Sequence, residues 1–141
     1  MEIIVQQNCQ HINWQQVAEL LQFYGLSDLD APTQQLVFSR SYAVVFLLQN
    51  KQVVGVGRAL SDGICQAAIY NVAVAEHLHG QQFGRLIIDK LVEQLSHCNI
   101  ILYTHPKTVK FYQRLGFSLM KTGLVHYGDD HLEAMREMGF G

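Results

Sequence analysis

The stretch that decides the fold reads IYNVAVA over residues 69–75, HGQQFGR over 79–85 and LIIDKLVEQL over 86–95. The first run is apolar and strand-sized, the second carries two glycines, and the third repeats its apolar side chains at the period of a helix. Where a strand leads through a loop into a helix, several backbone N–H groups lack partners and the helix dipole adds partial positive charge. We therefore expect a phosphate group at this loop, because glycine lets the backbone approach such a ligand closely.

A second motif, FYQRLGF, occupies residues 111–117, where a short helix is expected to end at Gly116. In this order and spacing, the two motifs resemble the GNAT acetyltransferase superfamily over roughly residues 36–121. The resemblance implies a GNAT fold of α+β type. Its mixed, mostly antiparallel sheet would have six to seven strands with a splayed parallel pair, flanked by four to five helices. It also implies acetyl-CoA (coenzyme A) as co-substrate, and it says little about the acceptor.

The resemblance assigns residues to a cofactor site, because in the family the glycine loop holds the pyrophosphate of acetyl-CoA and the preceding strand holds the pantetheine arm. Setting Gly84 on the last glycine of the family pattern Q/R-x-x-G-x-G/A puts His79 where Gln or Arg is usual and Gln82 where Gly is usual. If position 82 requires a positive φ, the Gln side chain costs of order 1 kcal/mol. The alternative is a strand-to-helix turn without a ligand. The assigned cofactor-binding residues are Val72, Ala73, Val74, His79, Gly80, Gln81, Gln82, Phe83, Gly84, Arg85, His105 and Phe111.

Acyl transfer from a thioester to an amine requires a neutral amine, stabilisation of the developing oxyanion and a proton for the departing thiolate. Tyr112 resembles the family's proton donor, and the reference pKa of a tyrosine, about 10, is close to that of an alkyl thiol. The alternative interpretation is that Phe111 and Tyr112 are core aromatic residues of a short helix without a catalytic role. The amide of Val72 is the expected partner of the thioester carbonyl. Where relatives often carry a carboxylate on the central strand this chain has Asn71, which we expect to position the amine or a water.

Two further side chains have competing interpretations. Asp62 is a candidate acid–base group, although Asp before Gly is more typical of a hairpin turn. His105 stands where the family often has Asn, so it either contacts the cofactor or lies exposed at a strand end.

Hydrophobic periodicity predicts the elements of a single domain over residues 1–141, without a linker or repeat. A hairpin turn is expected at Asn50 and Lys51, a helix cap at Asn13, and a capping pair of Asp130 with Glu133 in the last helix. The predicted strands are 2–6, 42–49, 52–60, 64–75, 99–104 and 117–121, and the predicted helices are 14–24, one from about 32, 84–96, 108–115 and 130–138.

Composition narrows the classes of partner. The net charge is −2 with scattered basic residues, which disfavours a nucleic-acid binder, and no apolar run reaches membrane-spanning length. Seven histidines form no recognisable ligand set, so no metal site is expected.

The N-terminus does not resemble a signal peptide, which favours a cytoplasmic location. The three cysteines are odd in number and far apart, which argues against a disulfide framework and also fits a reducing compartment; they are Cys9, Cys65 and Cys98. The apolar tail helix and an open sheet edge make a homodimer plausible.

Two functional hypotheses follow. The first is an acetyl-CoA-dependent N-acetyltransferase acting on a primary amine of a small molecule, because the chain has no acidic cluster to hold a basic peptide. Residues 58–62 and 69–72 are similar to small GNAT proteins of bacteria and plastids, including the serotonin N-acetyltransferase-like branch. The second hypothesis is a non-catalytic acyl-CoA-binding or sensing module with the same fold.

Overall fold

Five strands form one mixed sheet in the order β1-β2-β3-β4-β5 in the computed structural model, which describes residues 2–141. Strands β1 to β4 pair in succession as antiparallel neighbours, and β4 is parallel to β5. The chain divides into two compact units, Met1–Leu102 and Tyr103–Gly141, and the sheet belongs to the first. The strands are β1 (Ile4–Gln6), β2 (Ala43–Gln49), β3 (Gln52–Ser61), β4 (Gln66–Val74) and β5 (Asn99–Ile101).

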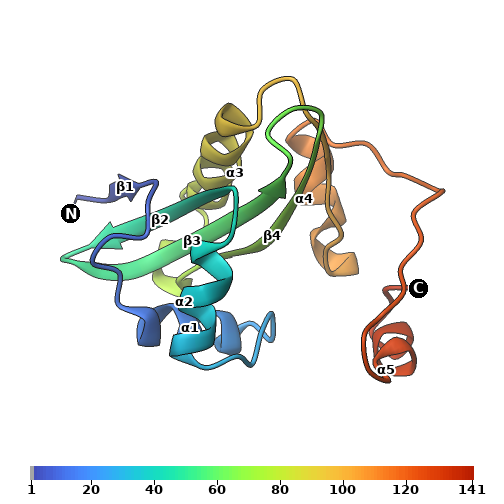
Figure 1. The fold of residues 1–141 in the computed structure, drawn as a ribbon, viewed down its shortest axis with the longest axis horizontal. Helices are drawn as coiled ribbons and strands as arrows, with labels where there is room; N and C mark the ends of the chain where they lie inside the picture. The colour runs from blue at the N-terminus through green and yellow to red at the C-terminus, as the bar shows by residue number, and fades with distance from the viewer. Residues whose placement is uncertain (1) are drawn as a thin grey trace. The chain divides into compact units, whose positions relative to one another are not determined.

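Helices cover both faces of this sheet. Helices α1 (Trp14–Phe23) and α2 (Ala31–Ser39) lie on one face and α3 (Phe83–Gln94) on the other (Figure 1). The side chain of Asn13 accepts a hydrogen bond from the Gln16 amide, which confirms the predicted cap of α1. With both faces covered, β2 is buried along nearly its whole length, and this explains its uninterrupted apolar sequence.

The sheet therefore has a hydrophobic core on each of its two faces. On the α1/α2 side Val17, Leu21, Phe38 and Phe46 are completely buried, and Trp14 packs against both phenylalanine rings. Full burial of each such side chain contributes about 1.5–3 kcal/mol. On the α3 side the buried residues are Ile87, Ile88, Leu91 and Leu95.

Two local features fix how the strands meet. Asn50 and Lys51 have φ values of 51° and 64°, as a tight two-residue hairpin turn requires, so the predicted turn between β2 and β3 is confirmed. At Gly57 of β3, a Cβ would lie 2.5 Å from Cγ2 of Ile87, so the missing side chain lets α3 pack directly on the strand.

The second unit contains a 3-10 turn η2 (Pro106–Thr108) and two short helices, α4 (Val109–Arg114) and α5 (Leu132–Glu137). The predicted strand at 117–121 is wrong: this segment forms no strand, and Leu119 and Met120 are 69% and 59% exposed, because no neighbouring strand pairs with it. The sheet therefore has five strands rather than six to seven, while the predicted α+β fold with a parallel pair is confirmed.

The cap predicted for the last helix is also wrong. Helix α5 begins at Leu132 with His131 in the N-cap position, and no side chain caps it. Asp130 therefore lies one residue too early for its carboxylate to reach the first-turn amides.

Candidate functional site

Strand β4 carries a bulge where the sequence predicted the acceptor site. Arg58 pairs with Tyr70 and Val56 with Ala73, so Asn71 and Val72 together oppose the single residue Gly57. Asn71 has a φ of 58°, a left-handed conformation that Asn tolerates better than most residues. The bulge therefore explains why Asn suits this position, independently of any catalytic role.

The side chain of Asn71 is held by a cation. Its Oδ1 accepts a hydrogen bond of 2.6 Å from Nε of Arg58, whose guanidinium also lies 5.2 Å from the Tyr70 ring centroid. Arg58 Nη1 donates to Ser41 Oγ at 3.3 Å. Because Oδ1 of Asn71 is bonded to Arg58, the Nδ2 amide group of Asn71, which can only donate, is left to orient a water. Sequence reasoning missed the role of Arg58, because it lies in an ordinary apolar strand.

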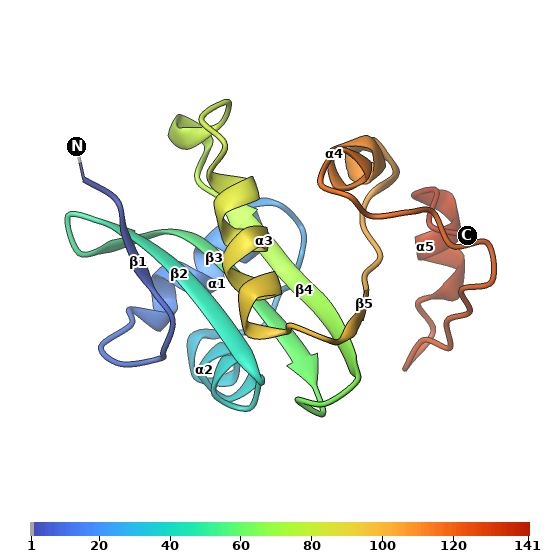
Figure 2. The same cartoon turned by 90° about the horizontal axis from the view of Figure 1, so that it is seen from above.

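Beyond its first residues, β4 separates from β5. The parallel ladder joins Gln66–Ala68 to Asn99–Ile101 and extends no further among the described residues, and Figure 2 shows the two strands diverging. Val72, Ala73 and Val74, the residues assigned to the pantetheine arm, lie in the separated part of β4. Ala73 and Val74 are buried and Val72 is half-buried, so their backbone rather than their side chains would meet a ligand.

The carbonyl of Val74 anchors the start of the following loop. It accepts hydrogen bonds from the Tyr24 hydroxyl at 2.5 Å and from Nε2 of His79 at 2.8 Å. Nε2 also lies 2.9 Å from the Tyr24 oxygen, and the two rings stack with centroids 5.8 Å apart. The Val74 carbonyl oxygen can only accept, so Nε2 of His79 carries the proton and donates to it.

This contact gives His79 a structural role that the family pattern did not indicate. Burial and the Glu76 carboxylate raise the pKa of the Tyr24 phenol, which therefore stays protonated and able to donate. Tyr24 lies 55 positions before His79, and no sequence motif links the two.

The loop itself presents backbone amides to solvent. Gly80 has a φ of 81° and a Cβ there would meet nothing within 4 Å, so its backbone is accessible from outside. Gln82 is the N-cap residue of α3 with a φ of 66°, and no side chain caps the helix. The amides of the first turn, at Phe83, Gly84 and Arg85, are thus the donors that an anion would meet.

Side chains of the loop leave this approach open. Gln81 and Gln82 are exposed, and the Gln81 side chain bends back to the His77 carbonyl at 3.4 Å. Arg85 lies 3.7 Å from Asp89 in an exposed pair, which contributes little and is readily exchanged for a phosphate.

Asp62 serves the turn between β3 and β4. Its Oδ1 accepts hydrogen bonds from the amides of Ile64, Cys65 and Gln66 at 2.7, 2.8 and 3.3 Å. These bonds hold the pKa of the carboxyl far below its usual range, which makes it a poor base. The turn-forming interpretation therefore accounts for this residue.

In the second unit, Tyr112 is half-buried between aromatic neighbours. Its ring packs edge-on against Phe111 and Phe117, with centroids 5.0 and 5.8 Å away. Burial raises the pKa of the phenol above its usual value near 10, so it stays protonated throughout the neutral range. Tyr112 can thus donate a proton, although the raised pKa makes it a weaker acid than a free phenol.

His105 is exposed and starts η2. Its Nδ1 accepts a hydrogen bond of 3.1 Å from the Lys107 amide, and its ring packs edge-on against Phe140. Strand β5 ends at Ile101 rather than at residue 104 as predicted, so the exposed His105 lies in the turn that follows the strand.

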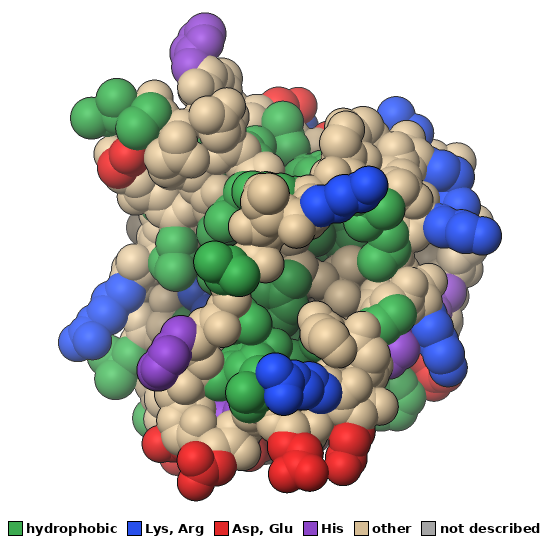
Figure 3. Space-filling view, turned by 90° about the vertical axis from the view of Figure 1, so that its right-hand side faces the viewer, with side chains coloured by type: hydrophobic (Ala, Val, Ile, Leu, Met, Phe, Trp, Pro, Cys, Tyr) green, Lys and Arg blue, Asp and Glu red, His purple; other side chains and the backbone are tan. Residues whose placement is uncertain are grey.

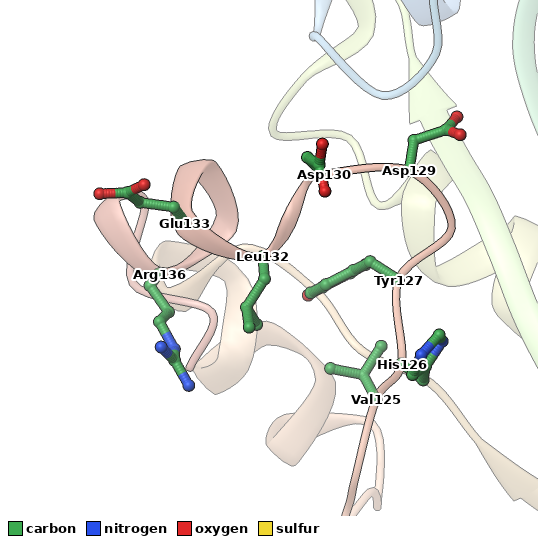
Figure 4. A pocket seen from close by; sticks show the side chains of 8 residues that line it. All are labelled: Val125, His126, Tyr127, Asp129, Asp130, Leu132, Glu133 and Arg136. Carbon is green, nitrogen blue, oxygen red and sulfur yellow. The ribbon is translucent and has the colours of Figure 1, made fainter.

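A separate depression of about 780 Å³ lies within the second unit and contains none of the predicted site residues. Figure 4 shows Val125, Tyr127 and Leu132 pointing toward one another there, while Asp129 and His126 point outward. Leu124, next to this depression, is fully exposed, and hydrophobic side chains also reach the surface in Figure 3.

Among residues 2–141, no group of three or more His, Cys, Asp and Glu side chains could hold a metal ion. No helix in this range is long and apolar enough to cross a membrane.

Comparison with known proteins identifies the family. Residues 8–133 match the model of the acetyltransferase (GNAT) domain. An uncharacterized N-acetyltransferase, ycf52, of Pyropia yezoensis is 28% identical over 76% of this chain and 66% of its own length. GCN5-related N-acetyltransferase 2, chloroplastic, of Arabidopsis thaliana is 37% identical over 54% of the chain, but the match spans only 31% of that protein.

Solved structures agree on the fold. The GNAT family acetyltransferase SP0256 of Streptococcus pneumoniae superposes with a TM-score of 0.77 at 20% identity, covering 92% of this chain and all of that one. The family match runs through both compact units and includes the bulged strand, the glycine loop and Tyr112. This chain therefore belongs to the GNAT acetyltransferase family.

Proposed function

We propose that this chain is an acetyl-CoA-dependent N-acetyltransferase that transfers the acetyl group to a primary amine of a small molecule by direct attack on the thioester. The observation that carries the proposal is the separated end of β4, which leads into a loop with accessible amides at the start of α3. Backbone donors of this kind suit the phosphates and amides of coenzyme A.

The chain's own groups can perform each part of the transfer. Acetyl-CoA supplies an activated acetyl thioester when bound. The amides of Phe83, Gly84 and Arg85 hold the diphosphate, and the Val72 amide donates to the thioester carbonyl oxygen where negative charge develops. Asn71 orients a water through its Nδ2 group, this water takes the proton that the attacking amine loses, and Tyr112 donates its proton to the departing sulfur. These assignments rest on the family motif and on the local geometry of each unit.

A small-molecule acceptor remains our choice over a protein. Two matched relatives name a substrate: serotonin N-acetyltransferase 2 of rice, 36% identical over 69 residues, and histone acetyltransferase TAP1 of soybean, 34% identical over 79 residues. The sequence has no long acidic run of the kind that would hold a basic peptide, which favours the first kind of substrate. A homodimer and a cytoplasmic location remain predictions, and some relatives are named as chloroplastic.

The alternative is a non-catalytic acyl-CoA-binding module. It is favoured by the absence of a carboxylate at Tyr70 and Asn71 and by the raised pKa of Tyr112, which weakens that residue as an acid. Such a module would bind acetyl-CoA without releasing thiol in the presence of any amine.

The test combines binding with turnover. Acetyl-CoA and the full chain are incubated with arylalkylamines, polyamines, amino sugars and a histone peptide while free thiol is measured, and calorimetry gives the affinity for coenzyme A. For an enzyme, Tyr112→Phe lowers kcat by about 100-fold or more while affinity for coenzyme A stays nearly unchanged. Tyr127→Phe, a tyrosine outside the predicted site, is the matched control.

Three other outcomes of this test would each change the proposal. Binding without turnover on any acceptor supports the non-catalytic module. Turnover that Tyr112→Phe leaves intact removes this residue from the mechanism. No heat at millimolar coenzyme A contradicts both readings.

A further inference from the structure

Cys65 and Cys98 are 33 positions apart in the sequence but meet at the start of the parallel pair. The Asn99 amide donates to the Cys65 carbonyl at 2.8 Å, and Gln66 pairs with Asn99. The two cysteines, each one residue earlier, are therefore opposite one another. Neighbouring strands lie about 4.8 Å apart, and disulfides bridge Cα atoms separated by about 4.4–6.8 Å. Residues at opposite positions of paired strands therefore have the backbone spacing that a disulfide requires.

Both thiols gather over one turn. Sγ of Cys65 lies 3.2 Å from Oδ2 of Asp62, and Sγ of Cys98 lies 3.7 Å from Oγ of the adjacent Ser61. The hydrogen bond to Asp62 and, to a smaller extent, desolvation raise the pKa of Cys65, so we expect this thiol to react more slowly than a free cysteine. Cys65 is exposed and Cys98 half-buried, so a small reagent reaches the pair through Cys65.

We propose that Cys65 and Cys98 are a redox modification site, forming a reversible disulfide that closes the strand–loop–helix segment between them into a ring. The oxidant is a small disulfide such as oxidised glutathione. The Cys65 thiolate attacks it, forming a mixed disulfide and releasing one glutathione thiolate. The Cys98 thiolate then attacks the Cys65 sulfur and releases the second glutathione. Two protein thiols are oxidised and one glutathione disulfide is reduced to two thiols.

The ring encloses β4, the glycine loop and α3. Its bond lies at the paired end of β4 and β5, away from the separated end, so it stabilises the segment without bridging the gap beyond Ala68. Because the bond restricts the unfolded chain, we expect the Tm to rise on the order of 10 °C on oxidation.

The test uses the full chain, reduced and then equilibrated in glutathione buffers ranging from fully reduced to fully oxidised. After acid quenching, intact mass and peptide mapping identify the products, and thermal unfolding follows in the same buffers. The wild type is expected to lose about 2 Da and give a cross-linked Cys65–Cys98 peptide. Cys9→Ser, which changes a half-buried thiol outside the pair, should behave as the wild type does.

The variants Cys65→Ser and Cys98→Ser test whether the disulfide and the rise in Tm both require this pair of cysteines. Each should fail to form an internal bond and show no rise in Tm in oxidised buffer. Glutathione adducts on Cys65 and Cys98 without a cross-link, a cross-link through Cys9, or a Tm that stays level or falls on oxidation would each overturn the proposal. The measurement needs no acetyl-CoA, so its result is independent of the proposed enzymatic function.

Discussion

Replacing Gln82 with glycine is expected to stabilise the protein slightly. With a φ of 66° and a ψ of 23°, Gln82 is in the left-handed region, which costs a side-chain-bearing residue about 1–2 kcal/mol. Glycine removes this cost but adds about 0.4–1 kcal/mol of unfolded-state entropy. The side chain is exposed and does not cap α3, so little else is lost. The net gain should be about 0.5–1 kcal/mol, or a Tm rise of about 2–3 °C for a chain of this length.

Urea and thermal unfolding of three variants check this estimate. Gln82→Ala keeps the strain and should match the wild type, whereas Gln82→Val adds β-branching and should be less stable than both. His97→Gly is a matched control, because His97 is exposed with a φ of 74° and lies outside the loop. It should give a similar gain in Tm.

Affinity for coenzyme A separates the two glycine variants. Gln82→Gly should keep or improve binding, since it clears the backbone that meets the phosphate, while His97→Gly should leave it unchanged. A clear loss of stability in Gln82→Gly, comparable to that of Gln82→Val, would refute the reasoning. It would show that the Gln82 side chain, rather than its backbone, holds the loop.

Two further predictions concern Tyr24 and Asp62. Tyr24→Phe removes the hydroxyl that donates to the Val74 carbonyl, so we expect the free energy of unfolding in urea to fall by about 1 kcal/mol and calorimetry to show weaker binding of coenzyme A. Tyr42→Phe, at an exposed tyrosine, is the control. Equal stability of the two variants would show that the Tyr24 hydroxyl does not stabilise the fold. For Asp62, the folded-state pKa is lowered from the reference value of about 3.9, so its stabilisation is present above that value and is lost as the pH falls through about 5 to 2. Asp62→Asn, whose oxygen can still accept from the turn amides, should flatten the pH dependence of unfolding in that window, and an unchanged acid profile would contradict the assignment.

Much of the site could be predicted from local sequence. The strand and helix around the glycine loop follow from the periods of their apolar residues, and the turn at Asn50 and Lys51 follows from its residue types. The bulge at Asn71 could not be predicted, because it depends on how β4 aligns with β3. The strand predicted at 117–121 failed for the same reason: its residues favour a strand, but a strand also needs a partner.

The sequence by itself determined the order of strand, loop and helix, the glycines that keep the loop backbone accessible, and the motif that holds Tyr112, since each depends on neighbours within a few positions. Only the tertiary structure decided that Tyr24 contacts His79 and Val74, that Arg58 donates to the oxygen of Asn71, and that Cys65 and Cys98 lie at neighbouring positions of paired strands. These contacts join residues between 13 and 55 positions apart. They follow from strand register and helix packing, which the whole core sets and no local pattern encodes.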